Sequence, residues 1–141
     1  ISLGLVGSEM CIRDSIAAKA LLLEGVDVYI PGGKLRTQSG SVMGSEAADF
    51  IRSFTLDQCF CGTSAVNLSK GICHPNIEEV EGNRAMIDAS RKKYIVSDSS
   101  KMNQTAPFKM FDIDCVDGFV VDNNFPPEYR EYMELHGIEV I

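Results

Sequence analysis

Apolar residues along this 141-residue chain recur with two spacings, one typical of helices and one typical of strands. The helical segments end at glycine or polar residues, and the strand-like segments are short, β-branched or aromatic. The expected helices are residues 15–24, 46–53, 78–91 and 126–136. The expected strands are residues 26–30, 58–61, 93–97, 115–121 and 138–141. Residues 65–76, rich in Gly, Asn, Ser and Pro, are expected to form a long loop.

Strand and helix alternate along most of the chain, an order typical of the α/β class. We therefore expect a mainly parallel sheet with helices on both faces. The chain is 45% hydrophobic and 23% charged, so it can bury a core and is not a disordered tail. No repeat, low-complexity run or interdomain linker divides it, which predicts one domain or part of one.

The first fifteen residues, ISLGLVGSEMCIRDS, differ from the rest. They resemble a peptide that recurs at the ends of unrelated gene predictions from shotgun assemblies, and they look like translated sequencing-adapter DNA. An ordinary N-terminal loop with a short apolar stretch is the alternative. We expect residues 1–15 to be foreign to the native protein, and residues 16–141 to be a native domain that starts in mid-gene.

Charge and cysteine content narrow the setting of the protein. The chain has 13 Lys+Arg and 20 Asp+Glu, which gives a net charge of -7. We therefore do not expect this chain itself to bind nucleic-acid phosphates. No run of about 18 apolar residues predicts a membrane span. Five cysteines without a framework spacing, and no secretory leader, favour a reducing compartment. We expect a cytoplasmic protein that does not contact a membrane.

Polar or glycine-rich segments follow four of the expected strands, at the point where each strand ends. They are PGGKLRT at 31–37, GTS at 62–64, DSSK at 98–101 and DNN at 122–124. The carboxyl ends of parallel strands share one edge of a sheet, where α/β proteins bind ligands. Backbone amides, with Lys34, Arg36 and Lys101, suit a phosphate group, and Asp98 and Asp122 suit hydroxyl groups. A small polyhydroxy anion is the expected ligand.

Each of these segments also has a plainer explanation. The pair Gly32 and Gly33 is typical of a strand-ending turn, and Asp98 of a cap on a short helical turn. Lys101 is a common kind of solvated surface residue. The acids within residues 78–81 suit the first turn of a helix, where the helix dipole favours negative charge.

Other kinds of site are not supported by the sequence. Cys59, Cys61, Cys73 and His74 lack the Cys-x₂₋₄-Cys spacing of structural zinc sites, so we expect buried free cysteines and no metal. Neither a dinucleotide fingerprint nor a Walker A motif is present. No catalytic set and no cofactor are therefore predicted.

Five ordered motifs are together more specific than any one of these segments. They are PGGKLRTQSGSVMG (31–44), DQCFCGTSAVNLSKGI (57–72), EEVEGNRAMIDASRKKYIVSDSSKM (78–102), VDGFVVDN (116–123) and GIEVI (137–141). Their order and spacing resemble the C-terminal sensor domain of DeoR-family transcriptional repressors, over residues 16–141. The resemblance implies the fold shared with ribose-5-phosphate isomerase and glucosamine-6-phosphate deaminase, incomplete here at its N-terminus.

The resemblance also implies a function. Such regulators bind operator DNA through an N-terminal winged helix-turn-helix, which this chain does not contain, and they form homo-oligomers. Their sensor domain binds a phosphorylated sugar or related metabolite, which alters operator affinity and so controls carbohydrate metabolism. The effector-binding positions implied in this chain are Gly32, Gly33, Arg36, Gly62, Thr63, Glu79, Glu81, Asp98 and Lys101. Among them Lys101 is the first choice for contact with a phosphate or sugar oxygen.

Two departures leave alternatives open. The family's first strand, with its glycine-and-threonine loop, is missing, and Asn83 replaces a helix lysine common in the family. A sugar-phosphate isomerase or deaminase on the same fold would use Glu79 or Glu81 as a base with Lys101. However, the loop that begins at Gly62 lacks the acid-rich segment of those isomerases. An interaction domain with a vestigial pocket is the third reading.

Overall fold

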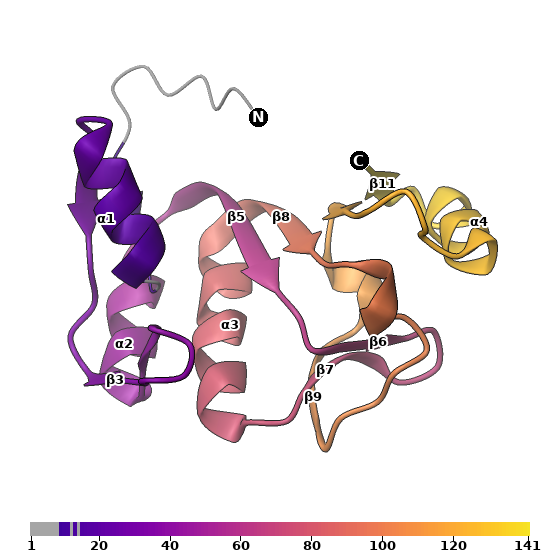
Figure 1. Cartoon of the computed structure of the whole chain (residues 1–141), viewed down its shortest axis with the longest axis horizontal. Coiled ribbons are helices and arrows are strands. Elements are labelled where there is room, and N and C mark those ends of the chain that lie inside the picture. Colours follow the sequence, from indigo (N-terminus) through magenta and orange to yellow (C-terminus); the bar gives the residue numbers. More distant parts are fainter. Residues whose placement is uncertain (1–8, 12, 14) are drawn as a thin grey trace.

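The structure, a computed structural model, describes residues 9–11, 13 and 15–141 (Figure 1). The expectation that residues 1–15 are foreign therefore falls largely on positions outside the described residues. It stays a prediction.

A four-stranded parallel sheet forms the centre of the molecule. Its strands are β5 (Leu56–Gly62), β8 (Ser90–Val96), β10 (Gly118–Val120) and β11 (Glu139–Val140). They lie in the order β11-β10-β8-β5, and every pair of neighbours is parallel. The expected α/β class with a parallel sheet is confirmed.

The register of this sheet brings three strand ends together. Gly62 of β5 pairs with Val96 of β8, and Val96 pairs with Val120 of β10. The segments that follow these three strands therefore leave the sheet at one edge, as parallel strands require. The segment after β2 (Asp27–Tyr29) does not join them in this sheet, because β2 pairs with β1 (Glu9–Cys11) in a separate parallel pair.

The prediction of a long loop over residues 65–76 was wrong. The segment contains β6 (Ala65–Asn67) and β7 (Gly71–His74), which form an antiparallel sheet with β9 (Phe108–Phe111). Asn67 turns the chain between the first two strands, because its Oδ1 accepts hydrogen bonds from the amides of Ser69 and Lys70. Composition did not reveal these strands, since three or four residues are too few to show an alternation beside Gly, Asn and Ser.

The expected strand at 115–121 is shorter than predicted. Only β10 is extended, because a 3₁₀ turn, η2 (Ile113–Cys115), takes the residues that precede it. Strand β9, just upstream, was not predicted. Two further strands, β3 (Lys34–Leu35) and β4 (Val42–Met43), form a small antiparallel hairpin within the first of the five motifs.

The four predicted helices are present with ends shifted by one or two residues. They are α1 (Ser15–Leu23), α2 (Ser45–Arg52), α3 (Ile77–Ala89) and α4 (Pro127–Leu135). α2 packs along α3, and proline at the start of α4 with Gly137 after its end agrees with the sequence pattern. Within the described residues, no helix has the length and apolar character needed to cross a membrane.

One face of the four-stranded sheet is buried. Cys59, Cys61, Ile95 and Phe119 lie on it in register and belong to the main hydrophobic cluster. Both α3 and α4 add side chains to this cluster, among them Val80, Ile87, Tyr129 and Met133. This burial stabilises the sheet and holds the edge at which β5, β8 and β10 end.

The opposite face is apolar but open in the described part of the chain. Phe60 and Val96 remain 43% and 46% exposed, and Phe60 stacks on Tyr94 with the ring centroids 5.4 Å apart. The Tyr94 ring in turn lies close over Gly118, where a methyl group would approach it to 2.9 Å. The helical covering that we expected on both faces is thus seen on one face of this sheet.

Candidate functional site

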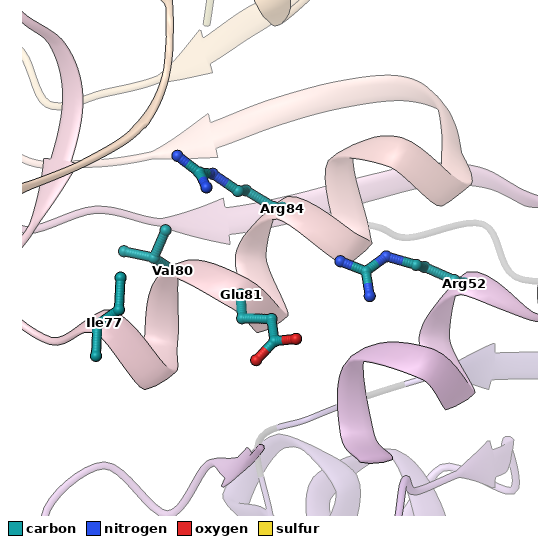
Figure 2. Close-up of a pocket in the computed structure, with 5 residues that line it drawn as sticks. All are labelled: Arg52, Ile77, Val80, Glu81 and Arg84. Carbon is teal, nitrogen blue, oxygen red and sulfur yellow. The ribbon is translucent and has the colours of Figure 1, made fainter. Parts of the chain in front are cut away.

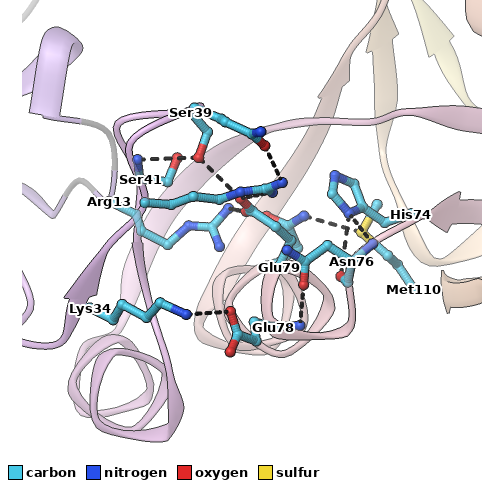
Figure 3. Close-up of polar contacts among 12 residues, drawn as sticks. Arg13, Lys34, Ser39, Ser41, His74, Asn76, Glu78, Glu79 and Met110 are labelled. Atoms are coloured by element: carbon cyan, nitrogen blue, oxygen red, sulfur yellow. Dashed lines mark hydrogen bonds and ion pairs between the residues drawn. The ribbon is translucent and has the colours of Figure 1, made fainter.

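The first part of the candidate site surrounds a buried carboxylate at the start of α3. Glu79 is only 5% exposed, and its carboxylate meets donors from two other segments (Figure 3). Arg13 Nη2 lies 2.9 Å from Glu79 Oε2, and Arg36 Nη1 lies 3.6 Å from Oε1. The Ser39 hydroxyl donates to Oε1 at 3.3 Å. We call Arg13, Arg36, Ser39, Glu79 and Asn83 the α3 charge cluster.

The hairpin of β3 and β4 carries two of these donors. Its turn is closed by the Arg36 amide, which donates to the Ser41 carbonyl at 3.0 Å, and by the Gly40 amide, which donates to the Arg36 carbonyl at 2.8 Å. Gly40 adopts a φ of 66°, which glycine tolerates without strain. The turn therefore presents Arg36 and Ser39 together to the first turn of α3.

Helix α3 offers negative charge to this hairpin from its first turn. Asn76 caps the helix, with its Oδ1 accepting from the Glu78 amide at 2.9 Å. Glu78 forms an exposed ion pair with Lys34 at 3.6 Å, and Glu79 points inward to Arg36. Opposite charges thus join the hairpin to the helix at two neighbouring positions.

Arg13 lies across the next turn of α3. Its Nη2 also donates to Asn83 Oδ1 at 2.8 Å, and a methyl group at Gly82 would come within 2.5 Å of its Nη1. Nη1 is buried and has no hydrogen-bond partner among the described residues. Arg13 belongs to the segment expected to be foreign, whereas Arg36, Ser39 and Glu79 belong to the segment expected to be native.

His74, at the end of β7, lies beside the cluster (Figure 3). Its Nδ1 accepts a hydrogen bond from the Asn76 amide at 3.1 Å. Burial lowers the pKa of His74 below its ordinary value; the neighbouring Arg13 and Arg36 act in the same direction and Glu79 opposes them. The ring is therefore neutral at pH 7 and adds a hydrogen-bonding group, not a charge.

The second part of the site follows β8 and contains two carboxylates. We call residues 98–103 with Asp122 the post-β8 turn. Asp98 Oδ1 accepts from the Ser100 hydroxyl and from the Ser100 amide at 2.9 Å. Asp122 Oδ2 accepts from the Ser99 amide at 2.9 Å and from its hydroxyl at 3.1 Å. The amides expected to bind a phosphate are therefore occupied by the protein's own acids.

These hydrogen bonds also determine the charge of the turn. Bonds from the Ser100 side chain and backbone lower the pKa of Asp98, and bonds from the Ser99 and Asn124 amides lower the pKa of Asp122. Both acids are ionised at neutral pH. Lys101, half-buried at the end of η1 (Ser99–Lys101), supplies the positive charge of the turn. The arrangement is better suited to sugar hydroxyl groups than to a phosphate on the amides.

A buried tyrosine anchors the post-β8 turn from α4. The Tyr129 hydroxyl accepts from the Asn103 amide at 2.9 Å and lies 3.1 Å from the Val66 carbonyl. Asn103 has a φ of 58°, uncommon for a residue other than glycine. Burial raises the pKa of Tyr129, so the hydroxyl keeps its proton and can donate it.

The glycine and threonine positions divide into open and packed ones. A methyl group at Gly32 or Gly62 would meet nothing within 4 Å, so space is free beside both. Gly33, with a φ of 135°, packs so closely that a methyl group would lie 2.7 Å from the Met43 carbonyl. Thr63 Oγ1 donates to the Ala65 carbonyl at 3.2 Å, a contact within its own turn.

The two acids offered as alternatives at the start of α3 lie on different sides of the helix. Glu79 faces the charge cluster, and Glu81 faces a shallow pocket between α2 and α3 (Figure 2). That pocket is lined by Arg52, Ile77, Val80, Glu81 and Arg84. Arg84 is already engaged there, because its Nε and Nη2 donate to the carbonyls of Met110 and Lys109. The structure brings two of the predicted site residues, Glu79 and Arg36, into contact. Glu81 lies on another side of α3 and does not join them.

Sequence reasoning missed three contributors. Ser39 reaches Glu79 only because the hairpin turn places it there, and its one sequence signal was the Gly40 that follows. His74 was considered as a zinc ligand and as the partner of a cysteine nucleophile, but not as a neighbour of Arg36 and Glu79. Tyr129 carries no sequence signal beyond an aromatic residue on an apolar helix face. Among the described residues, no three His, Cys, Asp or Glu side chains are arranged to hold a metal ion.

Comparison with known proteins identifies the family. Residues 11–123 match the DeoR C terminal sensor domain. The chain belongs to the DeoR family. The resemblance inferred from the five motifs is confirmed, and the match covers the α3 charge cluster and the post-β8 turn.

Several named relatives align with most of the chain. It is 33% identical over 127 residues to a protein of Escherichia coli O157:H7 named as a candidate aga operon transcriptional repressor, covering 90% of this chain and 47% of that protein. It is 29% identical over 126 residues to the glycerol-3-phosphate regulon repressor of E. coli K12, covering 89% and 50%. The HTH-type transcriptional regulator GlpR of Haloferax volcanii is 27% identical over 84% of this chain and 46% of that protein.

The chain spans about half the length of the curated relatives it matches. These relatives are named as transcriptional regulators or repressors, which favours the sensor reading of the DeoR domain over the isomerase or deaminase reading.

Proposed function

We propose that this DeoR domain, native from residue 16 to 141, senses a phosphorylated sugar or related metabolite for a repressor of carbohydrate metabolism. The observation that carries the proposal is the position of Arg36. Its guanidinium lies on a glycine-rich hairpin of a DeoR sensor domain, 30% exposed and held by charge to α3. A guanidinium in such a place suits a phosphate, which it binds through two parallel hydrogen bonds.

The post-β8 turn, at the edge of the four-stranded sheet, offers a second set of groups for a ligand. Asp98 and Asp122 are ionised acceptors at the sheet edge, and Lys101 is a donor beside them. Free space beside Gly62 allows a ligand to approach the same edge. Carboxylates and a lysine at such an edge suit hydroxyl groups, so the ligand class is a small polyhydroxy anion.

Control of transcription would follow from linkage, not from covalent chemistry. The operator would be bound by an N-terminal winged helix-turn-helix that is not in this chain, in a homo-oligomer. An effector that prefers one conformation of the oligomer changes operator affinity by the ratio of its two affinities. The name of one relative, a glycerol-3-phosphate regulon repressor, agrees with a small phosphorylated metabolite as the effector.

The proposal is tested by titrating the chain calorimetrically with glycerol 3-phosphate, a set of hexose phosphates and the matching unphosphorylated compounds. At least one phosphorylated compound should bind, and its unphosphorylated form should not. Arg36→Gln should weaken that binding by about tenfold or more, because it removes a charge-assisted contact. Arg52→Gln, an exposed arginine paired with Asp49, is the matched control. Binding that ignores phosphorylation or Arg36 would contradict the proposal.

Lys101 is tested in the same titration. Lys101→Ala should weaken binding of the phosphorylated compound by several-fold, whereas Lys70→Ala, an exposed lysine between β6 and β7, should not. If both substitutions leave the affinity unchanged, Lys101 does not contact the ligand.

A further inference from the structure

Arg36 already has an anionic partner within the protein. From this we propose that Glu79 is an internal counter-ion, which occupies the arginine's anion site and is displaced from Arg36 when an anionic ligand binds. The inference rests on the proposed function, because it assumes that the ligand is an anion. It adds that Glu79 sets the affinity of the site and restricts it to ligands with enough charge to compete.

The geometry of the ion pair shows that Arg36 is held loosely. Arg36 Nη1 lies 3.6 Å from Glu79 Oε1, an ion-pair separation longer than a hydrogen bond. Its Nη2 donates instead to Gln38 Oε1 at 2.7 Å, within the hairpin. A guanidinium offers five donors, so donors remain for a ligand. Arg36 is thus bound firmly to its own turn and weakly to Glu79.

The two partners also differ in how deeply their side chains are buried. The Arg36 side chain is 30% exposed, and the Glu79 side chain is 6% exposed. A ligand therefore reaches Arg36 from solvent without entering the buried pocket of Glu79. Once there, a dianion attracts the guanidinium more strongly than one carboxylate does, and the exchange keeps every charge paired.

The other partners of Glu79 allow it to lose Arg36. Ser39 Oγ donates to the same oxygen, Oε1, at 3.3 Å, and Arg13 Nη2 holds the other oxygen at 2.9 Å. The carboxylate remains hydrogen-bonded after Arg36 turns away. Ligand binding therefore costs the attraction between Arg36 and Glu79, and Glu79 also repels the incoming anion. Both effects lower the affinity for the ligand.

The test is a substitution that removes the charge of Glu79 and keeps its shape. Inorganic phosphate and glycerol 3-phosphate are titrated into the chain and into Glu79→Gln. Glu79→Gln should bind them about tenfold more tightly, because Arg36 no longer has a competing partner. Arg36→Gln should weaken binding, and adding Glu79→Gln to it should bring no gain.

Glu78→Gln is the matched control. It removes the same charge one residue earlier, from an exposed pair with Lys34, so it reports the general effect of a less acidic surface. Its affinity for phosphate should rise much less than that of Glu79→Gln. An equal rise in both variants would mean that Glu79 acts through long-range charge alone, and it would overturn the inference.

Two further outcomes are distinguishable. If the wild-type chain binds phosphate and Glu79→Gln binds it equally or more weakly, the counter-ion inference fails and the proposed function stands. If no phosphorylated compound binds the wild-type chain, both fail. If Glu79→Gln does not fold, Glu79→Asp replaces it. Asp keeps the buried charge but draws it back by one methylene from Arg36, and a several-fold gain in affinity is then expected.

Discussion

The α3 charge cluster and the post-β8 turn place carboxylates against hydrogen-bond donors in opposite ways. In the cluster, one buried carboxylate gathers side chains from segments far apart in the sequence. In the turn, exposed Asp98 accepts from the Ser100 amide two residues away, and half-buried Asp122 accepts from the amides of Ser99 and Asn124. The cluster therefore depends on tertiary packing throughout, whereas in the turn the cap made by Asp98 is local and only the contact between Asp122 and Ser99 joins distant segments. Substitutions in the two regions should differ accordingly.

The largest effect is expected at Glu79. Glu79→Ala leaves Arg36 and Arg13 without their buried counter-ion, and should lower the free energy of unfolding by about 3 kcal/mol or more. Urea denaturation measures this. Glu81→Ala, on the other side of the same helix, should change it by less than about 0.5 kcal/mol. Equal values for the two variants would mean that the buried cluster stabilises the protein no more than the half-buried side of α3 that carries Glu81.

The next effect is expected where the post-β8 turn meets the core. Tyr129→Phe removes a hydroxyl that serves the Asn103 amide and the Val66 carbonyl, and should lower the free energy of unfolding by about 1–2 kcal/mol. The Asn103 amide should then exchange its hydrogen faster than in the wild type. Tyr132→Phe, whose exposed hydroxyl meets Asp114, is the control. An unchanged Asn103 amide would show that Tyr129 does not anchor the turn.

A smaller effect is expected within the turn itself. Asp98→Ala removes the cap of η1, but water replaces an exposed carboxylate readily, so the loss of global stability should be less than for Tyr129→Phe. Hydrogen exchange at the Ser100 amide should nevertheless accelerate by about tenfold. If global stability fell as much as in Glu79→Ala, the contrast between the two regions would be wrong.

The smallest effect is the pH dependence of His74. Its pKa is lowered in the folded protein, so the unfolded chain takes up the proton first as pH falls. Stability should therefore decline as pH falls from 7 through the ordinary histidine value of about 6.5. His74→Gln should remove this decline, and His136→Gln, at the exposed end of α4, should keep it. If the decline in stability persists in His74→Gln, another titrating group must cause it.

Much of the fold was predictable because its signals are local. The helices α1 to α4 were expected from apolar spacing and their ends, and the four strands of the central sheet from short apolar runs. The strands β6, β7 and β9 were not expected because they are short, and because β6 and β7 contain the Asn and Gly that also mark loops. The pairing of β7 with β9 is long-range, from Ile72 to Phe111, and leaves no periodic pattern in either segment.

The residues of the candidate site were predictable in part, but the contacts between them were not. Arg36 and Glu79 were both expected near a ligand, from the family resemblance, but their mutual contact was not. The choice between Glu79 and Glu81 also required the structure. They are two residues apart on a helix, so their side chains point to different sides, and only packing shows which side is inward.

The sequence by itself determined the α/β class, the helices, the DeoR family and Asp98 as a cap of the short turn after β8. Each of these depends on neighbouring residues or on an ordered set of motifs. Only the tertiary structure decided which carboxylate is buried and which arginine it holds. An ion pair between the β3–β4 hairpin and α3 joins positions some forty residues apart, as does the Ser39–Glu79 bond. No local pattern encodes such a distance, because it follows from how the hairpin and helix pack together.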